Sequence, residues 1–147
     1  MLTLDKIYHA AFVLKEVARK TDLIHAPNLC PDAELYLKTE NLQVTGSFKL
    51  RGAYYKISQL TDEQKRAGII ACSAGNHAQG VALAATRQGA KSIVFMPDSA
   101  PISKVEATKR LGAEVCLVNG AYDDAYEAAV RRQEETGATF IHPFNDD

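Results

Sequence analysis

Four short apolar segments, each preceded by a glycine, constrain the fold of this chain more than any other feature. The glycines lie 21 to 25 residues apart, at Gly68, Gly89, Gly112 and Gly137. Glycine suits the left-handed position that ends a helix, and the β-branched residues after each one favour a strand. Helical patterns fill the intervals, at residues 77–88, 103–111 and 123–136. Strand–helix–strand units of this length predict an α/β fold with a small parallel sheet and flanking helices.

Length and composition exclude several classes of protein. The chain has 147 residues, enough for one domain of ordinary size. It lacks both the run of ~20 apolar residues that a membrane span requires and the layout of a signal peptide. Its net charge of −1 disfavours a nucleic-acid or membrane partner. Three widely spaced cysteines outside any C-x-x-C motif indicate a reducing, cytoplasmic location.

The first 68 residues follow a different pattern. Apolar residues at helical spacing over residues 4–17 predict an amphipathic helix, and the alternation at residues 34–38 predicts a strand. Ser47 is expected to cap a helix that runs to Leu60. The chain ends soon after the fourth predicted strand without a closing element, so we expect it to be part of a longer protein.

Lys49 is the first candidate functional residue. If Ser47 caps the helix, Lys49 and Arg51 lie in its first turn, where basic side chains oppose the helix dipole. The helix end, Arg51 and any burial all favour a neutral amine, which suits imine formation with a carbonyl cofactor. The plainer interpretation is a surface lysine that only adds solubility, and position alone favours it.

The loop at residues 72–80 is the second candidate. Ser73 and Asn76 ahead of a helix, with glycines that allow close approach, can form a nest of N–H groups for a carboxylate or phosphate. Ordinary capping by Ser73 or Asn76 explains the same residues, and His77 can be a structural histidine. Other common site motifs are missing: the sequence has no P-loop, no G-x-G-x-x-G, no G-x-S-x-G and no metal-ligand spacing.

Taken together, the two loops resemble those of the fold-type II pyridoxal-phosphate (PLP) enzymes, which share the fold of the tryptophan synthase β chain. Residues 47–53 (SFKLRGA) resemble the cofactor-lysine motif, and residues 73–80 (SAGNHAQG) resemble the substrate-carboxylate loop. Both are similar to the threonine/serine dehydratase branch rather than the cysteine synthase branch. Further similar stretches extend the resemblance over nearly the whole chain, at residues 96–105, 112–115, 122–125 and 142–144.

The resemblance implies a role for each candidate residue. Lys49 would carry PLP as a Schiff base beside Phe48, and Asn76 would hydrogen-bond the 3-hydroxyl of the cofactor. Ser73, Asn76 and His77 would hold the substrate carboxylate, while the Lys49 amine takes the α-proton. The implied reaction is β-elimination of L-threonine or L-serine, which yields 2-oxobutanoate or pyruvate and ammonia. Whether the reaction is catabolic or feeds isoleucine biosynthesis stays open.

The resemblance also implies a division of the chain. Residues 1–53 would begin the large PLP-binding domain, residues 54–144 would form a small mobile domain, and residues 145–147 would return to an incomplete large domain. The family's glycine-rich phosphate loop is not found in this sequence. We therefore expect an N-terminal fragment that is inactive alone and a complete enzyme that forms a homo-oligomer.

Two alternatives remain. A serine racemase of the same fold needs a second base, and in such racemases a serine stands where this chain has Ala74, whose methyl group cannot accept a proton. A non-catalytic module that binds amino acids would leave Lys49 without a purpose.

Overall fold

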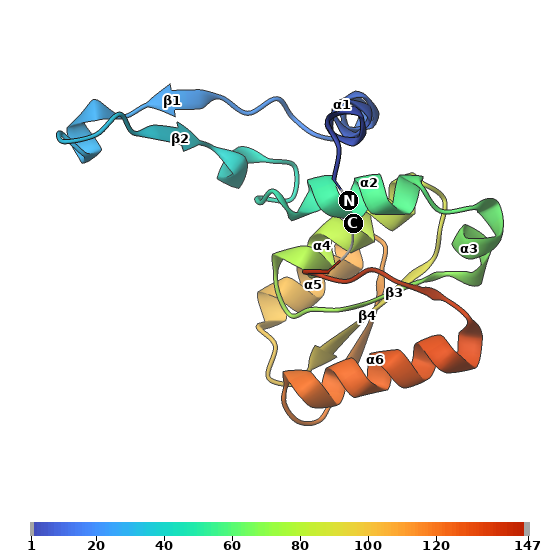
Figure 1. The fold of residues 1–147 in the computed structure, drawn as a ribbon. Helices are drawn as coiled ribbons and strands as arrows, with labels where there is room; N and C mark the ends of the chain where they lie inside the picture. Colours follow the sequence, from blue (N-terminus) through green and yellow to red (C-terminus); the bar gives the residue numbers. More distant parts are fainter. Residues whose placement is uncertain (1, 146–147) are drawn as a thin grey trace.

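The centre of the molecule is a four-stranded parallel sheet, seen in a computed structural model that describes residues 2–145 (Figure 1). The strand order is β5-β4-β3-β6. The strands are β3 (Ile69–Cys72), β4 (Ser92–Pro97), β5 (Glu114–Val118) and β6 (Thr139–Phe140). Each strand follows one of the four glycines, so the predicted α/β fold with a small parallel sheet is confirmed.

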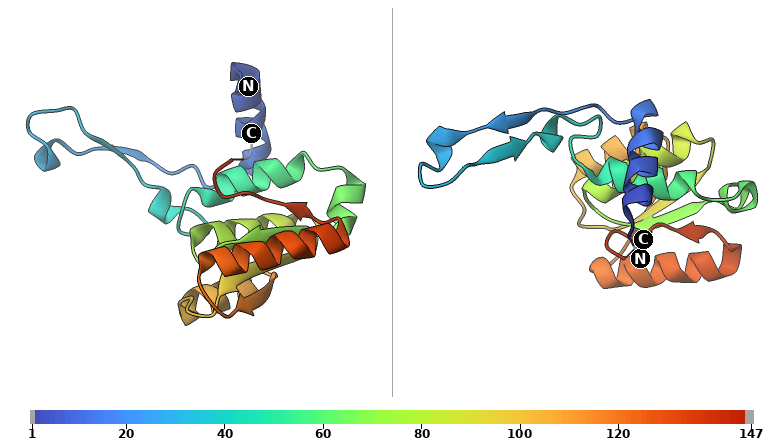
Figure 2. Two further views of the ribbon diagram at one scale, coloured as in Figure 1. Left: turned by 60° about the horizontal axis from the view of Figure 1, so that its bottom comes forward. Right: turned by 45° about the horizontal axis from the view of Figure 1, so that its top comes forward.

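Helices cover both faces of the sheet (Figures 1 and 2). On one face lie α4 (Asn76–Arg87) and α5 (Ile102–Arg110), and on the other lies α6 (Tyr122–Thr136). An outer layer on α4 is formed by α2 (Lys49–Ser58), which the short α3 (Asp62–Ala67) connects to β3. Gly137 ends α6 in the left-handed conformation, at φ 68°, as its position after a helix predicts.

Strand side chains alternate between two cores. Ile69 packs with Leu50 of α2 and Val81 of α4, whereas Ile70 packs with Ala125 of α6. Both isoleucines are 1% exposed. Burial on both faces is typical of parallel strands and accounts for their near-continuous apolar sequence.

The N-terminal part projects from this layered unit (Figures 1 and 2). It begins with α1 (Leu4–Val13) and the short helix η1 (Leu14–Glu16). Residues 19–43, called the arm below, contain the antiparallel pair β1 (Leu23–His25) and β2 (Tyr36–Lys38). Two further short helices lie in the arm, η2 (Pro27–Leu29) and η3 (Glu40–Leu42).

Apolar side chains of α1 and the arm stay exposed. The helix predicted over residues 4–17 is present as α1 and η1, and the strand predicted at residues 34–38 is present as the shorter β2. However, α1 buries no residue, and Leu4 and Tyr8 are 63% and 67% exposed. The predicted apolar face of α1 therefore has little cover among residues 2–145. No helix in this range is long and apolar enough to cross a membrane.

The division into domains stays a prediction. The expected boundary after residue 53 falls inside the continuous helix α2. Of the last expected part, residues 146–147 lie outside the described residues.

Candidate active site

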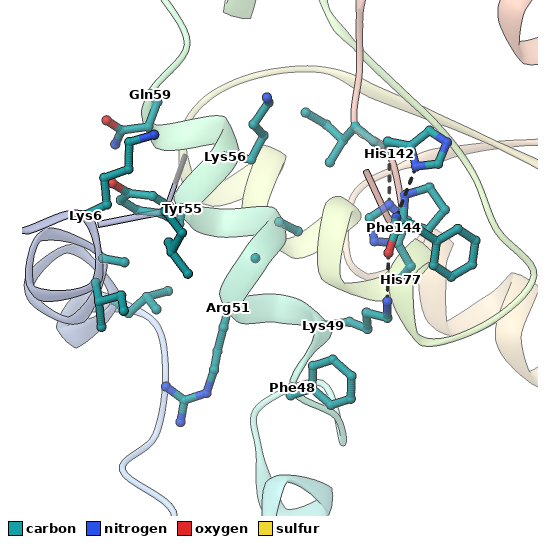
Figure 3. Close-up of a pocket in the computed structure, with 18 of the residues that line it drawn as sticks. Lys6, Phe48, Lys49, Arg51, Tyr55, Lys56, Gln59, His77, His142 and Phe144 are labelled. Atoms are coloured by element: carbon teal, nitrogen blue, oxygen red, sulfur yellow. Dashed lines mark hydrogen bonds between the residues drawn. The ribbon is translucent and has the colours of Figure 1, made fainter. Parts of the chain in front are cut away.

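Lys49 is the first residue of α2 and lines a pocket of about 650 Å³ that lies between α1, α2 and residues 141–144 (Figure 3). Its Nζ donates a hydrogen bond of 2.9 Å to the carbonyl oxygen of Pro143. The same nitrogen lies 5.5 Å from the ring centre of Phe48 and 5.3 Å from that of Phe144. The pocket thus presents a primary amine between two aromatic rings, each within reach of a cation–π attraction.

The helix that carries Lys49 starts differently from the sequence prediction. Phe48 is the N-cap and already has helical backbone angles, so Ser47 does not cap α2, and the helix ends at Ser58 rather than Leu60. Gly46, at φ 71°, turns the chain just before Ser47. The Ser47 hydroxyl is buried, and it has no hydrogen-bond partner among the described residues. The prediction is wrong because capping needs an extended residue directly before the first turn.

Arg51 points away from Lys49 (Figure 3). Its Nε and Nη2 each donate a 2.8 Å hydrogen bond to the Glu40 carboxylate. The pKa of Glu40 is lowered to about 2, and the hydrogen bonds from Arg51 are the largest cause. The sequence argument treated Arg51 as an unpaired charge acting on Lys49, whereas in the structure the Glu40 carboxylate balances that charge.

The second loop leaves the N-terminus of α4 without a side-chain cap. Its N-cap is Gly75, and no side chain caps the helix, so the prediction of capping by Ser73 or Asn76 is wrong. The Ser73 hydroxyl instead accepts a hydrogen bond of 3.2 Å from the Gly75 N–H, inside the loop. The first-turn N–H groups of a helix without such a cap favour an anion.

Asn76 is held by a lysine from α5. Lys104 Nζ donates a hydrogen bond of 3.0 Å to Asn76 Oδ1. Because this bond occupies the amide oxygen, the exposed Asn76 side chain can offer its Nδ2–H groups to a ligand.

His77 is buried, at 6% exposure, and its Nε2 lies 3.0 Å from the carbonyl oxygen of Ile141. Because a carbonyl oxygen only accepts, Nε2 carries the proton in this contact. The contact supports the structural interpretation of the ring, which also lines the pocket of Lys49.

The structure brings three of the five predicted site residues into one pocket: Phe48, Lys49 and His77. Ser73 and Asn76 lie at the start of α4 and are not among the residues that line it. The lack of a side chain at Gly80 allows α4 to lie close to the start of α2. A Cβ at this position would lie 3.0 Å from the Lys49 carbonyl carbon and oxygen. A larger residue at this position would separate α4 from the backbone of Lys49.

The sequence analysis assigned no role to three groups near the site: the Pro143 carbonyl, the Phe144 ring and the Glu40 carboxylate. A signal for the first two exists, because residues 142–144 follow β6 at the sheet edge where residues 73–75 follow β3. Glu40 has no comparable signal, since its position depends on how the arm folds.

Comparisons with known proteins identify the family. A family model described as "Pyridoxal-phosphate dependent enzyme" matches residues 14–147. The chain belongs to this family. It is 53% identical over 148 residues to a protein from Thermotoga maritima named L-threonine ammonia-lyase. This match covers 99% of this chain and 37% of the relative.

Solved structures show the same fold. Threonine deaminase isoform 2 from Solanum lycopersicum matches with a TM-score of 0.87 and 36% identity, over 99% of this chain and 44% of that chain. Maize serine racemase matches with a TM-score of 0.91 and 35% identity, over 98% of this chain and 44% of that chain. The chain therefore spans less than half the length of these relatives. The predicted resemblance to fold-type II PLP enzymes is confirmed.

The described residues fit part of PLP. Lys49 offers an amine to the aldehyde, and the rings of Phe48 and Phe144 lie beside that amine. Asn76, which is not among the residues that line the pocket of Lys49, carries N–H donors that would suit the 3-hydroxyl oxygen of the cofactor. Among residues 2–145, no group of three or more His, Cys, Asp or Glu side chains is placed to hold a metal ion.

Proposed function

We propose that this chain supplies the lysine-bearing part of the active site of a PLP-dependent ammonia-lyase for L-threonine or L-serine. The observation that carries the proposal is the Lys49 amine in its pocket, between the rings of Phe48 and Phe144. The relative from Thermotoga maritima, named for L-threonine, supports the substrate class.

Lys49 is the proposed base. When bound, PLP supplies an electron sink that stabilises negative charge on the α-carbon of the substrate. Lys49 Nζ then accepts the α-proton, for which it needs a neutral amine with a lone pair. The hydrogen bond to Pro143 is compatible with this role, because Nζ donates an N–H and keeps its lone pair.

The start of α4 is the proposed carboxylate site. Its N-terminus lacks a side-chain cap, which supports binding of an anion by Ser73, Asn76 and His77. His77 would take part through its backbone N–H, because its ring contacts Ile141. The Nδ2–H groups of Asn76, whose amide oxygen is bound by Lys104, suit the 3-hydroxyl oxygen of the cofactor.

Elimination is favoured over racemisation by Ala74. The structural match to maize serine racemase makes racemisation the second candidate. Racemisation needs a second base on the face of the α-carbon opposite the lysine, and the Ala74 methyl cannot serve as one. We therefore expect little D-amino acid from the enzyme, and we expect Ala74→Ser to increase racemisation relative to elimination.

We further propose a cytoplasmic homo-oligomer in which residues 1–53 belong to a large PLP-binding domain and residues 54–144 to a small mobile one. The exposed apolar residues of α1 and the arm support self-association, because such patches mark interaction surfaces. Formation of 2-oxobutanoate is compatible both with a catabolic role and with isoleucine biosynthesis.

A chimaera tests the proposed reaction. Residues 1–147 are joined to the remaining C-terminal part of the Thermotoga maritima relative, and keto acid and ammonia are measured with L-threonine and L-serine. Borohydride reduction should fix the mass of PLP on the peptide that contains Lys49. Lys49→Ala should abolish turnover. The control Lys109→Ala, which changes an exposed lysine of α5, should keep most of it.

Two outcomes would contradict the proposal. Label fixed mainly on Lys56 would show that Lys49 is not the cofactor lysine. Turnover by residues 1–147 alone, at the roughly 1–1,000 per second of ordinary enzymes, would show that the expected fragment is complete in itself.

A further inference from the structure

The first turn of α2 lacks the groups that normally stabilise a helix start. No side chain caps it, and its first turn contains no acidic residue. It contains instead two basic residues, Lys49 and Arg51, at the positive end of the helix dipole. The composition of this turn does not stabilise it, so the bond from the Lys49 amine to Pro143 depends on contacts that the turn makes with other elements. One such contact is the packing of Leu50, which is fully buried, on α4.

Glu40 provides the missing negative charge from outside the helix. Its carboxylate accepts two 2.8 Å hydrogen bonds from Arg51, one of 2.5 Å from the Thr21 hydroxyl and one of 3.4 Å from Gln43 Nε2. The Glu40 side chain is only 14% exposed. The Arg51 side chain is 33% exposed, so the pair is only partly buried. Its bidentate geometry fixes direction as well as charge.

Glu40 is itself held in place by the base of the arm. Gln43, at 3% exposure, accepts a 2.7 Å hydrogen bond from the Arg19 N–H and donates one of 3.0 Å to the Arg19 carbonyl. These bonds join the two ends of the arm. The carboxylate therefore belongs to a fixed structure rather than to a loose loop.

We infer that Glu40 and Arg51 are positioning residues for Lys49: their ion pair ties the first turn of α2 to the arm and thereby fixes the direction of the Lys49 amine. The inference rests on the proposed role of Lys49 as the cofactor lysine. Residues 49 and 51 lie about 200° apart around a helix. Arg51 can therefore be anchored on one side while Lys49 stays open to the pocket on another (Figure 3).

Two labelling reagents test the inference on the 147-residue chain. Formaldehyde with borohydride methylates any accessible amine and needs no cofactor site. PLP with borohydride also reacts with accessible amines, and it labels one lysine in excess of an exposed reference only where a site holds that amine and the cofactor together. The ratio of label on Lys49 to label on Lys109 is measured by peptide mass spectrometry. Lys109 is the reference, because it is an exposed lysine of α5 and is not among the described residues that line the pocket.

Glu40→Gln and Arg51→Met should each raise the formaldehyde ratio at least threefold and lower the PLP ratio at least threefold. Arg51→Lys should behave like Arg51→Met, because it keeps the charge but loses the bidentate geometry. The double variant should show no larger change than either single variant. The control Arg131→Met, which removes an exposed pair on α6 with a 3.5 Å separation from Glu127, should leave both ratios unchanged.

The outcomes separate this inference from the proposed function. Unchanged formaldehyde ratios, additive effects of the two substitutions, or wild-type ratios in Arg51→Lys would overturn the inference. If PLP does not label Lys49 in the unmodified chain while formaldehyde shows the expected changes, the positioning role stands and the cofactor role fails.

Discussion

The layered unit around the sheet and the arm have similar local sequences but very different burial. In β3 of the sheet, Ile69 and Ile70 are each 1% exposed. In β1 of the arm, Leu23 and Ile24 are 64% and 46% exposed. The helices that cover the sheet belong to this chain, whereas the arm has no comparable cover among residues 2–145. The apolar residues of a strand therefore do not determine its burial, which depends on a second layer packed against it.

Lys49 lies where these two regions meet. On one side, α2 packs on α4 through Leu50 and Ile57, both fully buried. On the other, Arg51 ties the same helix to Glu40 of the arm. The direction of the Lys49 amine therefore depends on a packed core and on an ion pair at once.

The largest expected effect on stability comes from changing an isoleucine to alanine in the sheet, which is compared with the same change in the arm. Ile70→Ala should lower the free energy of unfolding by about 2–5 kcal/mol, because it leaves a cavity between β3 and α6. Ile24→Ala in the arm should change it by at most about 0.5 kcal/mol, because that side chain is already in water. Urea denaturation of the 147-residue chain measures both. Equal losses would show that the arm is packed as firmly as the sheet.

The sheet unit could be predicted from the sequence, and most of the arm could not. The glycines before each strand and the helical intervals are local signals, and they place β3 to β6 within a few residues. β1 spans only Leu23–His25 and pairs with a strand across a long loop, so no local alternation identifies it. The same reason hides Glu40 as the partner of Arg51.

Within the candidate site, the residue types could be predicted but their contacts could not. Lys49 and His77 stand in recognisable loops. Their hydrogen bonds to Pro143 and Ile141, however, cross 94 and 64 residues of sequence. The ends of parallel strands meet at one edge of a sheet, but these contacts also require β6 to lie next to β3, and the sequence analysis did not predict that strand order.

The ion pair between the regions should make stability depend on pH. Glu40→Gln should cost about 1.5–3 kcal/mol at pH 7, as expected for hydrogen bonds to a charged group. The folded-state pKa of Glu40 is lowered from 4.5 to about 2, so its contribution is present above pH 4.5 and is lost as the pH falls towards 2. The difference between wild type and variant should shrink over this range in urea titrations.

A surface carboxylate is the control for that experiment. The Glu127 side chain is 71% exposed and lies 3.5 Å from Arg131. Glu127→Gln should lower the free energy of unfolding by at most about 0.5 kcal/mol. A Glu40→Gln difference that stays constant from pH 7 to pH 2 would contradict the proposed ionic contribution.

The side of α2 that packs on α4 should be sensitive to one methyl group added at Gly80 of α4. Gly80→Ala places a Cβ 3.0 Å from the Lys49 carbonyl and 3.1 Å from the Leu50 nitrogen, all of them backbone atoms. The two helices must separate, which should cost about 1–3 kcal/mol and reduce PLP label on Lys49. Denaturation and peptide mass spectrometry measure these effects, and a variant of unchanged stability would show that the contact is loose.

A substitution on the open side of α2 should raise the free energy of unfolding, and this is the smallest of the expected effects. Gly52 lies inside α2, and among residues 2–145 a Cβ there would meet no atom within 4 Å apart from its chain neighbours and the backbone of its own helix. Gly52→Ala should therefore stabilise the chain by about 0.4–1 kcal/mol, because alanine loses less backbone freedom on folding. The urea midpoint should rise with an unchanged slope. A lower midpoint would show that this face of α2 is already filled, and that the contrast between its packed and open sides is wrong.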